Sequence, residues 1–203
     1  SAPAVTYNDV TTASMTCPQE YTINRTWTAT DACGNSSTCA QIIVVDDSTP
    51  PVITLCPANI TIECDESTDP ANTGNATASD NCDTAPQVTF NDVTTASMTC
   101  PQEYTIDRTW TATDACGNTS TCTQVITIDD STPPSIVCPT DITLECTDST
   151  DPANTGSATS TDNCDPAPLV TYDDVTIGGN TCPQGYTITR TWHTQLAVLW
   201  IAT

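Results

Sequence analysis

Acidic residues gather in the loops expected for this chain, and carboxylates brought together in this way could bind a divalent cation. Asp80, Asp83 and Asp114 form one such group, and paired aspartates directly precede a proline-rich segment. Calcium takes about six to eight oxygen ligands in flexible geometry, which suits carboxylates supplied by several loops. We therefore expect two calcium sites, the first formed by Asp46, Asp47, Asp80, Asp83, Asp114 and Asn118, and the second by Asp129, Asp130, Asp162 and Asp165.

The net charge of the chain is consistent with a bound cation. There are 25 Asp and Glu residues against 3 Lys and Arg residues, which gives a formal net charge of −22 at pH 7. This charge repels nucleic acid and anionic membranes, so we expect neither as a partner. It also opposes a compact fold unless a cation offsets it. The alternative is a solvated acidic rim that keeps the protein soluble, and this alternative applies most strongly to a further acidic loop at 65–70, repeated at 147–152.

Glycosylation is the other chemistry that short motifs of this chain permit. Asn-X-Ser/Thr sequons occur at Asn24, Asn35, Asn59, Asn75 and Asn118. Hydroxyls that follow Asp and precede Thr or Ala, a pattern resembling a bacterial O-glycosylation motif, occur at Ser48, Thr84, Ser131 and Ser149. Both patterns arise easily in a threonine-rich chain, so these residues are candidate acceptors only.

Catalysis has little support in the sequence. The only histidine is His193, so no Ser-His-Asp or Cys-His arrangement recurs along the chain. Carboxylate pairs do recur, but none lies near an evident cleft. We therefore predict that the chain is not an enzyme and that it has no catalytic residues.

An internal repeat determines how these residues are positioned. The segment 17–23, Cys-Pro-Gln-Glu-Tyr-Thr-Ile, recurs at 100–106 and, with Gly in place of Glu, at 182–188. The period is therefore 83 residues (17 to 100) and then 82 residues (100 to 182). A long near-identical repeat is typical of proteins that build length. The chain begins and ends within a repeat, so we expect a piece of a longer polymer whose partner is itself, through head-to-tail repeats or filament subunits.

Paired prolines mark the boundaries between repeats. Asp-Asp-Ser-Thr-Pro-Pro occurs at 46–51 and again at 129–134, and paired prolines end a strand and stiffen a short linker. We call residues 1–47 repeat one, which is the C-terminal part of a unit. Repeat two, residues 48–130, is complete, and repeat three, residues 131–203, lacks its last hairpin and ends in a tail, 193–203, that departs from the pattern. A frameshift is as good an explanation of this tail as a genuine terminal strand.

Strand signals dominate repeat two. Runs rich in β-branched residues alternate with turn residues, and helical periodicity is absent. Six or seven short strands in about 82 residues indicate an Ig-like β-sandwich. The expected fold class is therefore all-β, with tandem, disulfide-rich Ig-like repeats whose strands are 52–55, 59–64, 75–79, 87–93, 104–114 and 121–129.

The run 104–114 alternates cleanly between two faces. Ile106, Arg108 and Trp110 share one face, which we expect to point into the core, so Arg108 should stack on an aromatic ring and reach an acid. Threonines occupy the other face and form a ladder in two repeats. The ladder permits an alternative function, binding of a surface glycan or of ice, through Thr26, Thr28 and Thr30 and through Thr109, Thr111 and Thr113.

Cysteine usage indicates an oxidising compartment. The chain has 13 cysteines at six positions per repeat, and none forms the tight CxxC pair of a zinc site. We therefore expect disulfides and an extracellular or cell-surface location. No apolar run approaches the length of about 20 residues needed to span a bilayer.

Three stretches resemble the hyalin-repeat family, Ig-like modules of extracellular and adhesion proteins, and its bacterial HYR-like relatives. They are Asp-Ser-Thr-Pro-Pro-Val-Ile-Thr-Leu-Cys-Pro at 47–57, Asp-Asn-Cys-Asp at 80–83 and the hairpin 113–122. The resemblance implies a disulfide between Cys56 and Cys122. Placing the remaining cysteines at the two ends of such a sandwich favours Cys64–Cys100 and Cys82–Cys116, with Cys146–Cys182 as the counterpart in repeat three; the rival pairs Cys116 with Cys122. The expected function is an extracellular fibre, filament or adhesin stalk stiffened by calcium.

Overall fold

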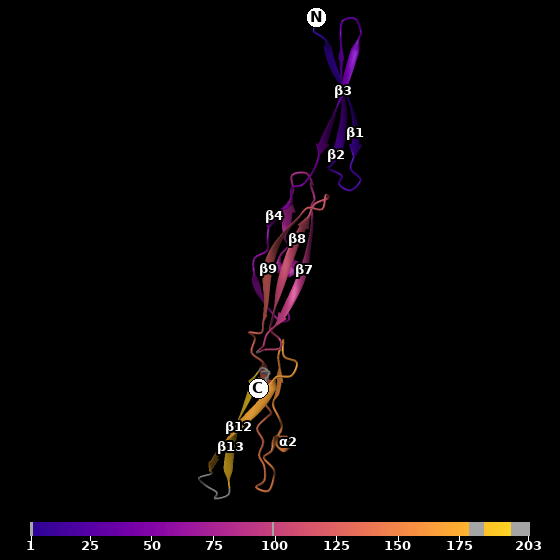
Figure 1. Cartoon of the computed structure of the whole chain (residues 1–203). Coiled ribbons are helices and arrows are strands. Elements are labelled where there is room, and N and C mark those ends of the chain that lie inside the picture. The colour runs from indigo at the N-terminus through magenta and orange to yellow at the C-terminus, as the bar shows by residue number, and fades with distance from the viewer. Residues whose placement is uncertain (1, 99, 179–184, 196–203) are drawn as a thin grey trace. The chain divides into compact units, whose positions relative to one another are not determined.

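The computed structural model describes residues 2–98, 100–178 and 185–195, and most of them lie in β-strands (Figure 1). Repeat one contains β1 (Ala4–Ala13), β2 (Tyr21–Thr30) and β3 (Ser36–Val45). Repeat two contains β4 (Val52–Leu55), β5 (Ile60–Glu63), α1 (Pro70–Thr73), β6 (Thr77–Ser79), β7 (Gln87–Ala96), β8 (Tyr104–Thr113) and β9 (Thr119–Asp129). Repeat three contains β10 (Ser135–Val137), α2 (Pro152–Thr155), β11 (Thr159–Thr161), β12 (Leu169–Gly178) and β13 (Tyr186–Gln195).

The strands form several sheets, which confirms the predicted all-β class. Strands β1, β2 and β3 form an antiparallel sheet in that order, and the four-stranded sheet of repeat two has the order β5-β9-β8-β7. Strand β5 runs parallel to β9, with Ile60 opposite Ile126. The pairs β4–β6, β10–β11 and β12–β13 are antiparallel. All six strands predicted for repeat two are present, together with one short helix, α1, that periodicity did not indicate.

Two compact units make up the chain. The first consists of Ser1–Ala58, Asp69–Val93 and Asp107–Val125, and the second of Asn59–Thr68, Thr94–Ile106 and Ile126–Thr203. Each unit therefore contains part of repeat two together with the whole of one neighbouring repeat as defined above. In the second unit the core is an isoleucine cluster, formed by Ile62, Ile106, Ile126 and Ile128.

Strand β13 extends into the tail, 193–203, where the sequence departs from the repeat pattern. Strand β13 includes His193, whose Nε2 lies 3.2 Å from the carboxylate of Asp173, so the first three residues of the expected irregular tail, 193–195, continue a strand. The rest of that tail lies outside the described residues. Among the residues that the structure describes, no helix is long and apolar enough to cross a membrane.

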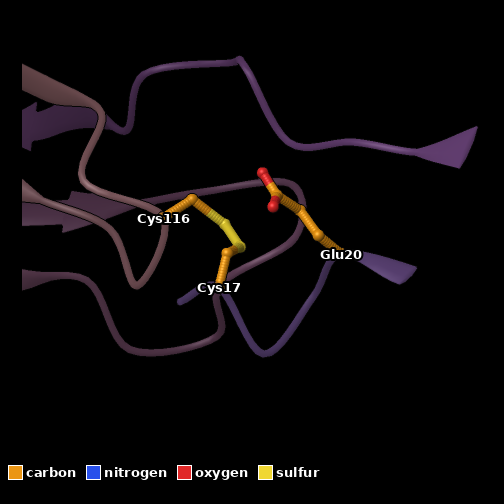
Figure 2. A group of neighbouring side chains, drawn as sticks. All are labelled: Cys17, Glu20 and Cys116. Carbon is orange, nitrogen blue, oxygen red and sulfur yellow. A yellow bond between two sulfur atoms is a disulfide. The ribbon is translucent and has the colours of Figure 1, made fainter. Parts of the chain in front are cut away.

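Three disulfides cross-link the described residues, and two of them join different repeats. Cys56–Cys122 closes repeat two, as expected, with Cα atoms 6.3 Å apart. Cys17 of repeat one is bonded to Cys116 of repeat two (Figure 2), and Cys64 of repeat two is bonded to Cys164 of repeat three, with Cα separations of 4.5 Å and 5.8 Å.

The predicted pairs Cys64–Cys100 and Cys82–Cys116 are therefore wrong, as is the rival Cys116–Cys122. Those predictions assumed that each repeat pairs its own cysteines, whereas the loops that carry Cys64 and Cys116 meet loops of the adjacent repeat. Cys82, Cys100 and Cys146 are among the described cysteines that have no disulfide, and Cys182, the expected partner of Cys146, lies outside the described residues.

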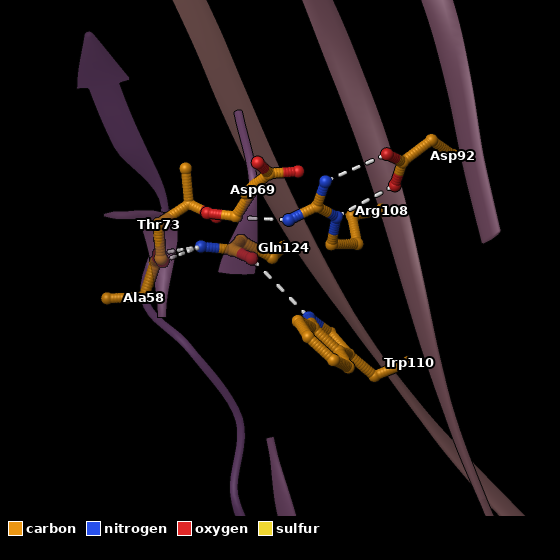
Figure 3. A network of polar contacts seen from close by, with 7 residues as sticks. All are labelled: Ala58, Asp69, Thr73, Asp92, Arg108, Trp110 and Gln124. Atoms are coloured by element: carbon orange, nitrogen blue, oxygen red, sulfur yellow. Dashed lines mark hydrogen bonds and ion pairs between the residues drawn. The ribbon is translucent and has the colours of Figure 1, made fainter. Parts of the chain in front are cut away.

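Arg108 is the centre of a buried polar network in the first unit (Figure 3). Its side chain is 2 % exposed, and Nε and Nη2 each donate to a carboxylate oxygen of Asp92 at 2.8 Å. Nη1 donates to Oγ1 of Thr73 at 3.0 Å, and the guanidinium lies 4.3 Å from the centroid of the Phe90 ring. The expected stacking of Arg108 on an aromatic ring, with an acid as its partner, is confirmed.

Gln124 extends this network towards the start of repeat two. Its side chain is fully buried; Nε2 donates to the carbonyl oxygens of Ala58 at 3.0 Å and Thr73 at 2.7 Å, while Oε1 accepts from Trp110 Nε1 at 3.4 Å. A buried amide is stable only with such partners. The network thus links β8 and β9 to α1 and to the segment before β5.

Gly74 provides a test of how tightly α1 is packed. Its φ is +102°, and an added Cβ would lie 3.1 Å from Cβ of Pro57, whereas Gly117, with a φ of +91°, has nothing within 4 Å of such an atom. We expect Gly117→Ala to cost about 1–3 kcal/mol of unfolding free energy from backbone strain alone. Gly74→Ala should cost about 1 kcal/mol more, because Pro57 must also move. Urea unfolding of both variants checks this, and equal losses would contradict the close packing of Gly74 on Pro57.

Candidate metal sites

The aspartates of the expected calcium sites lie in three kinds of loop. Asp46 and Asp47 follow β3, and their counterparts Asp129 and Asp130 lie at the end of β9. The loop 80–83 follows β6, and its counterpart 162–165 follows β11. The loop 114–118 connects β8 to β9. The residues of the first expected site all lie in the first unit, and those of the second site all lie in the second unit.

The loop 80–83 leaves one carboxylate oxygen of Asp80 unused. Oδ1 of Asp80 accepts from the backbone N–H groups of Asp83 and Cys82, each at 2.8 Å, and these bonds lower the pKa of Asp80. Oδ2 is buried and has no hydrogen-bond partner among the described residues. Asp162 repeats this geometry, since its Oδ1 accepts from the N–H groups of Cys164 and Asp165 at 2.8 Å and its Oδ2 is buried and unpaired.

Asp47 and Asp130 are more deeply buried. Asp47 is 5 % exposed and Asp130 is 8 % exposed. Oδ2 of Asp47 and both carboxylate oxygens of Asp130 are buried without a hydrogen-bond partner in the described part of the chain. Oδ1 of Asp47 accepts a long bond, 3.3 Å, from the N–H of Thr49. A buried carboxylate without a partner is costly unless a cation neutralises it.

These unpaired carboxylate oxygens lie close to other acidic groups. The ligand atoms of Asp47, Asp80 and Cys82 all lie within 4.8 Å of one another. In the second unit the same holds for Glu63, Asp130 and Cys164. Desolvation, followed by the negative charges of Asp162 and Glu63, raises the pKa of Asp130, because each disfavours its ionised form. Both sites therefore concentrate negative charge.

Three other residues of the predicted first site, Asp83, Asp114 and Asn118, use their side chains in hydrogen bonds that shape the loops. Although desolvation opposes it, hydrogen bonds from Asn118 and Cys116 keep the pKa of Asp114 below its usual value. Asn118 Nδ2 donates to Oδ2 of Asp114 and to the carbonyl oxygen of Asp47, each at 2.9 Å. Asp83 accepts from the N–H groups of Ala85 and Ala115, and Asp46 is exposed to solvent.

The second site has the same division of roles. Asp165 is 3 % exposed and accepts from the N–H of Ala167 at 2.9 Å, as Asp83 does from Ala85. Asp129 is half-buried at the end of β9. Asp130 and Asp162 of the second site thus correspond to Asp47 and Asp80 of the first, since all four have a buried carboxylate oxygen without a hydrogen-bond partner among the described residues.

Sequence reasoning missed Glu63. Its carboxylate accepts a hydrogen bond from Oγ of Ser131 and a longer one, 3.4 Å, from the N–H of that residue. Glu63 directly precedes Cys64, and the same Glu-Cys pair recurs at Glu145. That recurrence, immediately beside a cysteine that joins two repeats, is the signal that could have identified it.

A third group of possible ligands is not a metal site. Cys17, Glu20 and Cys116 lie close together (Figure 2), but the two sulfur atoms are joined in a disulfide. A disulfide sulfur is not a thiolate and cannot act as the usual metal ligand. For the same reason, Cys164 contributes no thiolate to the group that contains Glu63 and Asp130.

Several of the glycosylation candidates already use their amide nitrogens. Nδ2 of Asn35 donates to Asp31 at 2.9 Å and Nδ2 of Asn75 donates to the carbonyl oxygen of Pro70 at 3.3 Å, in addition to the bonds of Asn118.

The threonine ladder of β8, Thr109, Thr111 and Thr113, is half-buried. Asn24 and Thr26 are exposed on β2.

Comparisons with known proteins add no assignment. No family model matches the chain, and no curated protein matches it. The hyalin-repeat resemblance consequently rests on the motifs at 47–57, 80–83 and 113–122 alone.

Proposed function

We propose that this chain is a length of an extracellular structural polymer, a fibre or adhesin stalk of tandem Ig-like repeats, whose junctions are cross-linked by disulfides and bind calcium. One observation carries the proposal. At each junction a buried aspartate that follows the last strand of one repeat, Asp47 or Asp130, has at least one carboxylate oxygen without a hydrogen-bond partner among the described residues. The adjacent loop of the next repeat presents an equally unpaired oxygen, from Asp80 or Asp162.

Calcium fits these sites better than a side-chain cation does. The chain has no lysine, and each of its three arginines, Arg25, Arg108 and Arg190, is bound to an aspartate outside the two sites. The donor atoms available are carboxylate and carbonyl oxygens, which hard cations prefer. A cation held between two repeats would restrict their relative motion, which is the property that a stalk requires.

Three disulfides support an oxidising, extracellular location. Two of them join one repeat to the next. The junctions therefore resist extension through covalent bonds as well as through the coordination of calcium by side chains. Near-identity of the repeats is consistent with a spacer, because a spacer needs no unique surface.

Calcium titration tests the proposal. At calcium concentrations about 100-fold above the dissociation constant, each occupied site should stabilise the protein by about 2.7 kcal/mol. The double variant Asp47→Asn, Asp130→Asn should lose this gain. Without calcium, the same variant should be more stable than the parent, since it removes buried like charges. The measurement is thermal unfolding with calcium and with chelator, together with calorimetric titration.

The control changes the net charge equally at exposed positions. Asp107→Asn with Asp141→Asn removes two charges outside both sites, and Asn24 already occupies the position of Asp107 in repeat one. This control should keep the full calcium response. A parent protein that shows neither binding heat nor a shift in unfolding temperature with millimolar calcium would refute the calcium part of the proposal.

A further inference from the structure

The two disulfides that join repeats use different pairs of positions. In the register of repeat two, Cys17 occupies the position of Cys100 and Cys164 occupies the position of Cys82. One junction therefore shows a bond from position 100 of one repeat to position 116 of the next. The other junction shows a bond from position 64 of one repeat to position 82 of the next.

We infer that every junction is built for both bonds, so that Cys82 bonds to repeat one and Cys100 to repeat three when those adjacent repeats are complete. Cys82 would bond to the Cys64 counterpart of a complete repeat one, which would precede Ser1. Cys100 would bond to the Cys116 counterpart of a following repeat; in this chain that position is Val198. The inference rests on one part of the proposed function, that the chain is a polymer of repeats. It does not depend on whether the junctions bind calcium.

The loop around Cys82 already has the conformation of its bonded counterpart. The N–H of Cys82 donates to Oδ1 of Asp80 at 2.8 Å, as the N–H of Cys164 donates to Oδ1 of Asp162 at 2.8 Å. Cys82 is exposed, and it lies beside Asp47, so it faces the end of the preceding repeat. The cysteine is therefore positioned for a bond before its partner arrives.

The loop around Cys100 matches that of bonded Cys17 in the same way. In both, the cysteine N–H donates to a serine Oγ at 3.3 Å, that of Ser97 or Ser14. In both, the glutamate three residues later donates its N–H to the cysteine carbonyl at 3.2 Å, from Glu103 or Glu20. The sulfur of each also lies near the side-chain oxygen of the glutamine two residues later.

The pairing of cysteine positions seen in the three disulfides explains why each of the other described cysteines lacks a bond. These are Cys33, Cys39, Cys82, Cys100, Cys138 and Cys146. Within repeats the rule pairs position 56 with 122, and between repeats it pairs 64 with 82 and 100 with 116. None of the six finds its partner position occupied by a described cysteine of this chain.

Two bonds would hold a junction differently from one. With one disulfide, two neighbouring repeats are connected at two points, the main chain and the S–S bond. The repeats can still rotate about the line that joins these two points. A second disulfide adds a third connection and prevents that rotation. The neighbouring glutamate adds to the effect, because Glu63 lies with Asp130 at the calcium site while Cys64 bonds to Cys164. The N-terminal part of a complete repeat one would therefore supply a carboxylate, the counterpart of Glu63, beside Asp47 together with a sulfur to Cys82.

Bond formation requires an oxidant. The two thiols lose two protons and two electrons as the S–S bond forms, and a disulfide oxidant such as oxidised glutathione accepts them and leaves as two thiols. The test therefore folds the protein in a glutathione redox buffer, blocks remaining thiols by alkylation and maps the peptides without reduction.

An extended chain supplies the missing partner of Cys82. A copy of residues 48–83 placed before Ser1 restores the repeat, because Ser1 occupies the position of Thr84. We expect Cys82 to change from nearly complete to nearly absent alkylation and to appear in a peptide joined to the added copy of Cys64. In the matched control, the added copy carries serine at that position. Cys82 should then stay alkylated, while the added copy of Cys56 still bonds to Cys39.

A second chain tests Cys100 independently. Residues 193–203 are replaced by a copy of 111–122, which introduces the Cys116 counterpart, and Cys100 should then lose its alkylation. Alkylated Cys82 in the first chain and alkylated Cys100 in the second, with Cys17–Cys116 still formed, would overturn the inference. Repeating the mapping with chelator separates it from the calcium proposal, since loss of calcium should leave both bonds unchanged.

Discussion

Replacing Cys64 and Cys164 together by serine should lower the free energy of unfolding by about 4–5 kcal/mol, according to the loop-closure relation for a disulfide. The bond spans 100 residues of sequence, so its loss frees a long loop in the unfolded chain. Because Cys64 also packs at the edge of the isoleucine cluster, a small loss of apolar contact adds to the effect. Urea unfolding of the oxidised protein, followed by tryptophan fluorescence, measures the change.

Cys82 and Cys146 provide a matched control for this prediction. They occupy the same two positions of the repeat as Cys164 and Cys64, and neither has a disulfide in the described chain. Replacing both with serine should change the unfolding free energy by no more than about 0.5 kcal/mol, as expected for exposed substitutions. An equal loss in the two double variants would show that the cross-link between repeats two and three contributes nothing to stability.

Arg108→Met should destabilise the protein by about 3 kcal/mol, the lower end of the range for breaking a buried ion pair. The lower end applies because Asp92 keeps 30 % exposure and can be hydrated once the guanidinium is gone. Methionine retains much of the side-chain volume, so the loss reports the ion pair, the hydrogen bond to Thr73 and the stacking on Phe90. Chemical unfolding of the variant provides the measurement.

Arg25 supplies the control, since it has the same type of ion pair in repeat one. Its bond to Asp9 is also 2.8 Å long, but the arginine side chain is 23 % exposed, compared with 2 % for Arg108. Arg25→Met should therefore cost only about 0–1 kcal/mol, as exposed ion pairs do. If the two variants lose the same amount, burial is not what gives the Arg108 network its stability.

Much of the local structure could be predicted from the sequence. The alternation along 104–113 identified the buried face of β8, because side chains in a strand point alternately to two sides and only one side meets the core. It also placed Arg108 between Ile106 and Trp110, and an arginine on that face must find an acid and a ring. The all-β class followed from the same short-range signals.

The acidic loops were identified from the sequence, but the roles of their members were not. Asp80 and Asp83 lie in one loop and have the same side chain. Only the fold shows that Asp83 uses both oxygens on backbone N–H groups while Asp80 keeps one oxygen buried and free. Such a difference depends on where neighbouring backbone groups point, which residue type and spacing do not specify.

What the sequence by itself determined is the repeat, the strands within it and the positions of its cysteines. Only the tertiary structure decided which repeat supplies the partner of each cysteine. Cys17 and Cys100 have nearly identical sequence surroundings, so no local signal distinguishes pairing within a repeat from pairing with its neighbour. A disulfide forms between cysteines whose Cα atoms approach to about 4.4–6.8 Å, and that approach is set by how loops of successive repeats meet in space.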